Sequence, residues 1–280
     1  MVNKNLRRIA DRLGSEDLPR EEAEEIILPT SDIDYVPSYV LLESRFHGDY
    51  IQSDLLVGLH RLKYVSRMKG LNMKLPFDVK NTVIDDDGNR YKKNFIGNIS
   101  YDESMQLIKA MGHLPVNLRV FVDFLKELRD GARGKKNVFD ERGNKIDQSI
   151  LESAYDEIVQ VRGPDRIERL NDSYAGRNIS VVQRTVVEGN GRVVQRADVC
   201  REYLKIDGKP GRIDLDHWLN YATSEGLPPK NTPRGNLIYW PPMEGGIRFG
   251  TNSYGTNLNC SATKLDQDSN MGIRVCKLKK

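Results

Sequence analysis

The amino-acid sequence predicts an α+β fold from three observations. Four glycine-containing turns each join two short extended runs and so predict hairpins, at 82–93, 137–147, 185–196 and 204–215. Between the first two of these predicted hairpins, apolar residues recur at helical spacing in two consecutive segments. Long irregular loops separate the regular segments. This mixture of helices, antiparallel hairpins and long loops is typical of α+β proteins.

The two central helices have clear end signals. Ser100 and Glu103 form the pattern of a capping box, which predicts a helix over 102–112. A Leu-Pro step then ends this helix, and Asn117 is expected to cap a second helix that ends at Gly131. A third helix is expected over 148–160, followed by a charged segment.

The segments before this centre divide the chain in two. Residues 1–35 carry two short helix patterns, and we interpret them as an N-terminal helical extension that packs on the main body or on another subunit. The main domain is expected over 36–280. It begins with strands over 35–46, because Val, Tyr and Phe are enriched there. Helical spacing over 49–70 then predicts a helix that carries His60.

The second half of the chain is expected to be mostly strands. Residues 179–187 and 192–200 are rich in Val and predict a strand pair. Residues 213–226 return to a short helix with Leu215, Trp218 and Leu219 as its buried side chains. A proline-rich loop over 224–236 then leads into a final extended region.

Composition limits the functions to consider. The net charge is only +3, from 43 basic and 40 acidic residues, so nucleic acid is not an expected partner. No apolar run has the length of a membrane-spanning helix, and the charged N-terminus lacks the apolar core of a signal peptide. We therefore expect a soluble protein with no membrane partner, in the cytoplasm or associated with a virion.

Catalytic, cofactor and metal motifs are not evident. The sequence has no glycine-rich phosphate loop and no nucleophile elbow, and its four histidines are scattered singly. The acidic turn at 85–87 does not fit a calcium loop, because Val83 and Asn94 would occupy the first and last ligand positions. We therefore predict neither a cofactor nor a metal.

The three cysteines, Cys200, Cys260 and Cys276, form neither a metal-spaced cluster nor an even disulfide framework. Three buried thiols in a reducing compartment are the simplest interpretation. A bridge between Cys260 and Cys276 remains an alternative.

The last 36 residues, from Gly245, form the most unusual stretch. Gly, Asn, Ser, Thr and Asp dominate its middle, yet apolar residues interrupt it at regular intervals, as in Asn257-Leu258-Asn259-Cys260. A flexible linker would lack these apolar positions. The period of two predicts a strand with one buried face and one displayed face.

Three segments together resemble a known family. YDESMQLIKAMGHLPVNLRVFVDFLKELR (101–129) looks like the two helices of C-type-lectin-fold proteins, GNLIYWPPMEGGIRFG (235–250) resembles a strand entry of that fold, and SNMGIRVCK (269–277) resembles its closing strand. The match is greatest with the variable proteins of diversity-generating retroelements, in particular archaeal and candidate-phyla ones. The resemblance covers the chain from about Tyr35 to its C-terminus.

This resemblance implies a C-type-lectin-like fold and a ligand-binding protein that is not an enzyme. In the family, a reverse transcriptase copies a template with errors at adenines, and the copy replaces the 3′ end of the gene. The family pattern implies a variable ligand-binding region over 246–271. Its variable positions would be Arg248, Gly250, Asn252, Tyr254, Gly255, Asn257, Asn259, Ser261, Ala262, Thr263, Leu265, Asp266, Asp268 and Asn270.

The residue types in this region agree with that mechanism. Mutated AAY codons never encode Lys, Glu, Gln, Met or Trp, and none of these types occupies a variable position. The types Lys, Gln and Met do occur in the region, at Lys264, Gln267 and Met271, which the pattern treats as invariant. Loops favour Asn, Gly, Ser and Asp in any case, so an ordinary loop would show the same agreement.

We expect the variable side chains to point outward on one face. The scaffold side chains would point inward, namely Ile247, Phe249, Leu258, Cys260, Met271, Ile273 and Val275. Tyr254 and then Arg248 are the expected anchors for a protein or cell-surface ligand.

Three other interpretations remain. An enzyme of the formylglycine-generating type shares the fold, but its chemistry needs a closely spaced reactive cysteine pair and calcium-binding loops. A viral structural component that binds a receptor overlaps with the first interpretation. The simplest alternative is an α+β domain whose Asn-rich stretch is only a loop.

Overall fold

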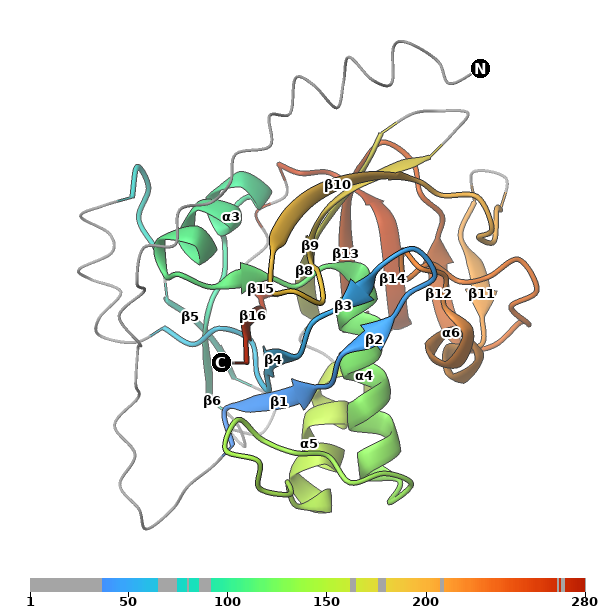
Figure 1. The fold of residues 1–280 in the computed structure, drawn as a ribbon. Coiled ribbons are helices and arrows are strands. Elements are labelled where there is room, and N and C mark those ends of the chain that lie inside the picture. Colours follow the sequence, from blue (N-terminus) through green and yellow to red (C-terminus); the bar gives the residue numbers. More distant parts are fainter. Residues whose placement is uncertain are drawn as a thin grey trace.

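The computed structural model describes residues 37–64, 75–79, 81–85, 92–161, 165–175, 180–206, 209–265, 267 and 270–279. The expected extension over 1–35, and with it the domain boundary, lies outside these residues. The described chain is α+β, as predicted, with four helices and several sheets in which antiparallel pairing predominates (Figure 1). The helices are α3 (Tyr101–Ala110), α4 (Leu118–Ala132), α5 (Gln148–Val159) and α6 (Leu215–Tyr221).

An eight-stranded sheet contains most of the second half of the described chain. Its strands are β8 (Arg166–Ala175), β9 (Val181–Val187), β10 (Val193–Val199), β11 (Gly211–Ile213), β12 (Leu237–Trp240), β13 (Gly245–Asn252), β14 (Gly255–Ala262) and β15 (Met271–Ile273). The order is β10-β9-β8-β13-β14-β12-β11, and β15 pairs with β8. The β12–β14 and β15–β8 pairs are parallel.

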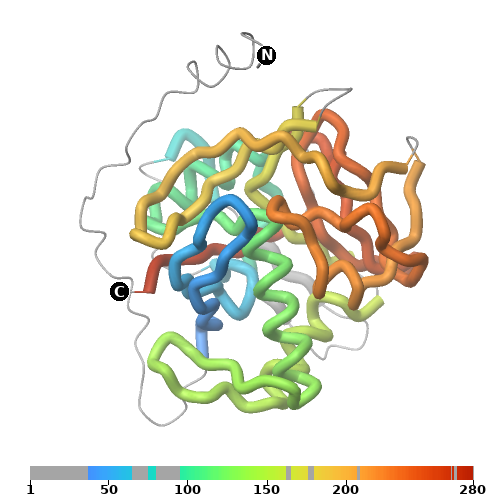
Figure 2. The backbone as a smooth tube through the Cα atoms, turned by 45° about the vertical axis from the view of Figure 1, so that its right-hand side comes forward, coloured from blue at the N-terminus to red at the C-terminus, as the bar shows by residue number. Residues whose placement is uncertain are grey.

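A four-stranded sheet brings the two ends of the described chain together. It has the order β1-β4-β16-β7 and consists of β1 (Tyr39–Leu42), β4 (Leu55–Gly58), β16 (Val275–Leu278) and β7 (Leu114–Pro115). Two hairpins complete the strands, β2 (Arg45–Phe46) with β3 (Ile51–Gln52) and β5 (Asn81–Asp85) with β6 (Lys92–Ile96). Figure 2 shows the C-terminal strand beside the first strands of the domain.

Both predicted helix caps are confirmed. Ser100 Oγ accepts a hydrogen bond from the Glu103 N–H, and the Glu103 carboxylate accepts one from the Ser100 N–H, which completes the capping box of α3. Asn117 Oδ1 accepts from the Val120 N–H at 2.8 Å and so caps α4. Local side-chain to backbone bonds therefore set where both helices begin.

The main core lies between α4, α6 and the inner face of the large sheet. Phe249 of β13 contacts Phe121 of α4 and Trp218 of α6, with ring centroids 5.1 and 6.0 Å apart. All three side chains are fully buried. The expected buried residues Leu215, Trp218 and Leu219 are confirmed. Burial of large aromatic side chains contributes strongly to stability, so this face of β13 is part of the scaffold.

The predicted helix over 49–70 is wrong in the part of it that is described. Residues 51–52 and 55–58 form β3 and β4 instead. The β4 run Leu-Leu-Val-Gly is buried throughout and pairs with β1 on one side and β16 on the other. In a strand that is buried on both faces, apolar and polar residues do not alternate, so its sequence can be mistaken for that of a helix. His60 follows this strand, with Nδ1 3.3 Å from Glu157 Oε2.

Two of the four predicted hairpins are confirmed, at 82–93 and 185–196. The segment 137–147 does turn back on itself, because the Ile146 N–H donates to the Val138 carbonyl and the Asp140 N–H donates to the Asn144 carbonyl, both at 2.9 Å. Its arms form an isolated bridge between Phe139 and Lys145 rather than a pair of strands. The hairpin over 204–215 is wrong, because β11 pairs with β12 rather than with its own neighbour in the chain.

The charged segment before Asn171 was not expected to be a strand. It forms most of β8, which is the neighbour of β13 in the large sheet. Two of its charged side chains, Arg166 and Glu168, are buried and bonded to each other at 2.5 Å. Because these two side chains neutralise each other, a charged segment can form a strand in the middle of the sheet.

Candidate functional site

One face of β13 and β14 displays the side chains that the sequence assigns to ligand binding. Leu258 and Cys260 of β14 are fully buried, whereas Asn257, Asn259 and Ser261 between and beside them are partly exposed. This alternation confirms the predicted period of two. We call this side of β12, β13 and β14 the outer face.

Strand register joins the outer face into rows. Arg248 of β13 lies opposite Asn259 of β14, which lies opposite Trp240 of β12. Trp240 is 37% exposed. The row therefore places a guanidinium, an amide and an aromatic ring side by side, although the three residues belong to three strands. Trp240 was not among the predicted site residues, because nothing in the amino-acid sequence indicates that β12 pairs with β14.

The expected inward set is confirmed in full. Every member is at most 5% exposed, and the members are Ile247, Phe249, Leu258, Cys260, Met271, Ile273 and Val275. All of them except Met271 belong to one of the two apolar cores of the domain. The residues that support the outer face from within are therefore different from the residues that it displays.

The β13–β14 turn presents the most exposed aromatic residue in the described part of the chain. Tyr254 is 83% exposed. Asn252 Oδ1 accepts from the backbone N–H groups of Tyr254 at 2.9 Å and Gly255 at 3.1 Å, which fixes the turn. Leu265 and Thr263, beyond the other end of β14, are also exposed. The face therefore has a prominent residue near each end.

Three of the predicted variable positions are buried, so the expectation that they are displayed to a ligand is wrong for them. Gly250 is buried, and a Cβ atom there would lie 2.7 Å from the Arg166 carbonyl oxygen of β8. Gly255 has φ +141°, a conformation that strains side-chain-bearing residues. Ala262 is 7% exposed.

The remaining positions lie at the far end of the region. Asn270 is partly buried, and its carbonyl oxygen accepts from Arg61 Nη1 at 2.9 Å and from the Ile167 N–H at 3.2 Å. Its backbone therefore holds the segment onto β8. Asp266 and Asp268 lie outside the described residues.

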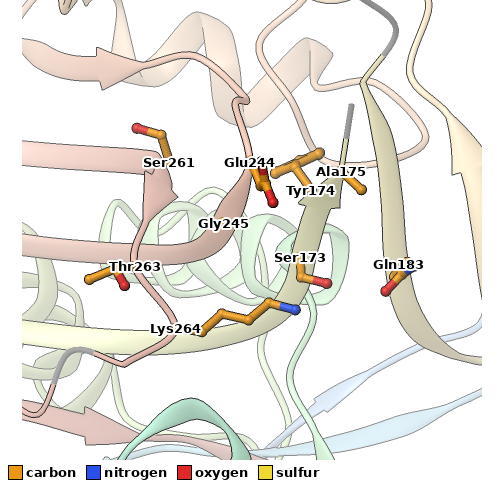
Figure 3. Close-up of a pocket in the computed structure, with 9 residues that line it drawn as sticks. All are labelled: Ser173, Tyr174, Ala175, Gln183, Glu244, Gly245, Ser261, Thr263 and Lys264. Carbon is orange, nitrogen blue, oxygen red and sulfur yellow. The ribbon is translucent and has the colours of Figure 1, made fainter. Parts of the chain in front are cut away.

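A cavity of about 390 Å³ opens beside the outer face, where β8, β9, β13 and β14 come together. Figure 3 shows its lining, in which the Lys264 side chain extends toward Ser173. Two of the lining residues, Ser261 and Thr263, belong to the predicted variable set; the others are Ser173, Tyr174, Ala175, Gln183, Glu244, Gly245 and Lys264. The sequence analysis missed Ser173 and Gln183, because their nearness to β14 depends on strand order.

The chemistry of this region is suited to non-covalent recognition. Amide, hydroxyl, ammonium, guanidinium and carboxylate groups surround the cavity and the outer face, together with exposed aromatic and aliphatic side chains. Such groups bind by hydrogen bonding and contact. Among the described residues, no group of three or more His, Cys, Asp and Glu side chains is placed to hold a metal ion.

The cysteine thiols lie behind the outer face. All three are free and buried, so the alternative of a Cys260–Cys276 bridge is wrong. Burial raises the pKa of the Cys276 thiol to about 12, and burial also raises the pKa of Cys260 well above its ordinary value. A thiol with so high a pKa is protonated at neutral pH and is a weak nucleophile.

No protein-family profile, curated protein or solved structure matches this chain. No helix in the described part of the chain is both long and apolar enough to cross a membrane.

Proposed function

We propose that this chain is a non-catalytic binding protein of C-type-lectin-like fold whose outer face is diversified by a retroelement. The observation that carries the proposal is the separation of roles within β14. Side chains that alternate along this single strand either enter the core, as Leu258 and Cys260 do, or face outward, as Asn257 and Asn259 do. Outward residues can therefore change without loss of the core.

The arrangement of the helices and the last strand supports the fold assignment. The resemblance depends on two helices joined by a Leu-Pro break and on a closing strand. In the structure α3 and α4 flank Leu114-Pro115, which is itself β7, and β7 pairs with the closing strand β16. The first and third segments of the resemblance are therefore adjacent, and Phe249 of the second segment packs against Phe121 of the first.

The structure refines which positions would vary. Within residues 248–265 we restrict the diversified set to the exposed or partly exposed positions, namely Arg248, Asn252, Tyr254, Asn257, Asn259, Ser261, Thr263 and Leu265. Gly250 and Gly255 are kept by backbone geometry, and Ala262 by burial. Tyr254 would act as the main anchor for a protein or cell-surface ligand, because a large exposed ring can bury much area at little entropic cost.

The experiment is DNA sequencing of the 3′ end of the gene across the source population, together with its downstream flank. The proposal predicts that substitutions gather at these eight positions and spare Gly250, Gly255 and Ala262. It also predicts a nearby repeat with adenines at the same codon positions, beside a reverse-transcriptase gene. An invariant 3′ end without such a repeat would rule out diversification and leave a lectin-like domain of unknown activity.

A further inference from the structure

The strand β10 forms one end of the large sheet and leaves one of its edges open. It pairs with β9 over its whole length, from Val193 opposite Val187 to Val199 opposite Val181, without a bulge. In the described chain no strand pairs with its second edge. Figures 1 and 2 show β10 as a long, curved strand on the outside of the fold.

Hydrogen bonds at the two ends of the β9–β10 pair define which backbone groups face the open edge. The Glu188 N–H donates to the Arg192 carbonyl, and the Cys200 N–H donates to the Ser180 carbonyl, both at 2.9 Å. In an antiparallel pair the hydrogen-bonded positions alternate. The even-numbered residues of β10 therefore bond to β9.

The odd-numbered residues of β10, namely Val193, Gln195, Ala197 and Val199, consequently direct their backbone N–H and C=O groups toward the open edge. Within the described residues these groups have no hydrogen-bond partner. An edge of this length with an unbroken register and no proline is a template for the addition of another strand.

We propose that this edge pairs with the same edge of a second copy of the chain, antiparallel and about a two-fold axis at Gln195. Such an arrangement would join the two large sheets into one continuous sheet. A two-fold interface uses the same surface on both copies, so one exposed edge is sufficient to form it.

Charge selects this register over its neighbours. With the axis at Gln195, Arg192 of each copy lies opposite Asp198 of the other. An axis at Arg196 would place Arg196 of one copy opposite Arg196 of the other. An axis at Val194 would place Arg192 of one copy opposite Arg196 of the other. Like charges directly opposite each other are destabilising, whereas opposite charges stabilise a strand pair.

The pair of Arg192 and Asp198 would also have favourable geometry. Even-numbered residues form the non-hydrogen-bonded pairs across this edge, and in such pairs the side chains are closest. Asp198 already bonds Arg184 at 3.0 Å and Arg196 at 3.1 Å within its own copy. A carboxylate has about four lone-pair sites, so it can accept from a further guanidinium.

Exposed apolar residues beside the β9–β10 turn add surface that the second copy could cover. Phe46 and Ile51 lie opposite each other in the β2–β3 hairpin and are both more than half exposed. The hairpin is attached to the strand pair because Asp49 bonds Arg196, and Ile51 packs against Gly189. Backbone pairing alone buries little area, so such flanking contacts strengthen an interface.

The test is the mass of the full chain in solution at tens of micromolar, measured by light scattering after size exclusion. We expect about twice 32.0 kDa. Ala197→Pro removes one N–H group at the open edge and should yield the monomer mass, whereas Ala197→Ser keeps this group and should remain dimeric. Circular dichroism establishes that each variant is folded.

A second variant keeps the test decisive if the proline variant does not fold. Arg192→Asp places two acidic residues opposite each other and should raise the dimer dissociation constant at least about tenfold, an effect that added salt reduces. A monomeric wild-type chain overturns the proposal. So does a dimer whose mass and dissociation constant are the same in folded Ala197→Pro or Arg192→Asp.

Discussion

Arg274 holds Glu168 through two hydrogen bonds, from Nε to Oε2 at 2.9 Å and from Nη2 to Oε1 at 2.5 Å. Both side chains are completely buried. Arg274 lies between β15 and β16, and Glu168 lies on β8 opposite Phe249 of β13. This pair therefore connects the closing strands to the strands that support the outer face.

Loss of the Glu168 charge should destabilise the domain. Burial alone would raise the pKa of Glu168, but Arg274 and Arg166 lower it to about 2, so the carboxylate is charged at neutral pH. Glu168→Gln removes the buried carboxylate that pairs with Arg274 and leaves Arg166 only its longer contact with Glu157, at 3.6 Å. The substitution should lower the free energy of unfolding by about 3–5 kcal/mol. Urea denaturation measures the change.

The matched control is Glu202→Gln, which removes an exposed carboxylate paired with Lys230. Exposed substitutions of this kind change stability by less than about 0.5 kcal/mol. Equal effects of the two substitutions would contradict a structural role for the buried pair.

A second carboxyl group has the opposite pH behaviour. Burial raises the pKa of Asp172 to about 7. The native state therefore keeps a proton that the unfolded state releases at about pH 4, so stability should fall as the pH rises through this interval and level off above it. Each pKa unit corresponds to about 1.4 kcal/mol.

Asp172→Asn should remove this part of the pH dependence. Asp172 Oδ2 accepts from the Leu118 N–H at the start of α4, and an amide oxygen can do the same. Unfolding free energies measured between about pH 4 and pH 8 should therefore decline less steeply in the variant than in the wild type. Parallel curves for the two proteins would show that Asp172 ionises normally.

Gly250 should not tolerate a side chain, although the family pattern assigns it to the variable set. A Cβ atom there would lie 2.7 Å from a backbone oxygen of Arg166, which cannot move without displacing β8. Gly250→Ala should destabilise the domain by about 1–3 kcal/mol. At Gly246, on the same strand, the nearest atom would be 3.7 Å away, so Gly246→Ala serves as the tolerated control in thermal unfolding.

The cysteines distinguish a binding protein from the enzyme alternative. Since all three thiols are buried and burial raises their pKa values, a thiol reagent should label none of them rapidly in the native protein at neutral pH and all three after denaturation. Rapid labelling of Cys260 or Cys276 in the folded chain would instead support a reactive pair and the formylglycine-generating type of chemistry.

Features that depend on neighbouring residues were predictable from the sequence. The caps at Ser100 and Asn117 are set within four residues of each helix start. The alternation through Leu258 and Cys260 is equally local, because side chains along one strand point to opposite faces. These features identified the helix pair and most of the outer face.

Features that depend on distant partners were not predictable. The sequence of β4 has the pattern of a helix because strands on both sides bury it. The sequence of β8 has the pattern of a charged surface segment, and its burial depends on Arg274, 106 residues away, which pairs with Glu168. The burial of Gly250 follows from the close approach of β8, and Trp240 joins the site only through the β12–β14 pairing. Pairings between segments that are distant in the chain decide all of these outcomes.

The central claim is that the outer face can change while the scaffold stays intact. The most direct measurement is saturation mutagenesis of residues 245–271 with a cell-surface display signal that reports folding. We predict broad tolerance at Tyr254, Asn257 and Asn259 and intolerance at Phe249 and Leu258, whose truncation to Ala should cost about 2–5 kcal/mol. If the outward positions prove as restrictive as the buried ones, the face belongs to the scaffold and the account of a diversified binding surface is wrong.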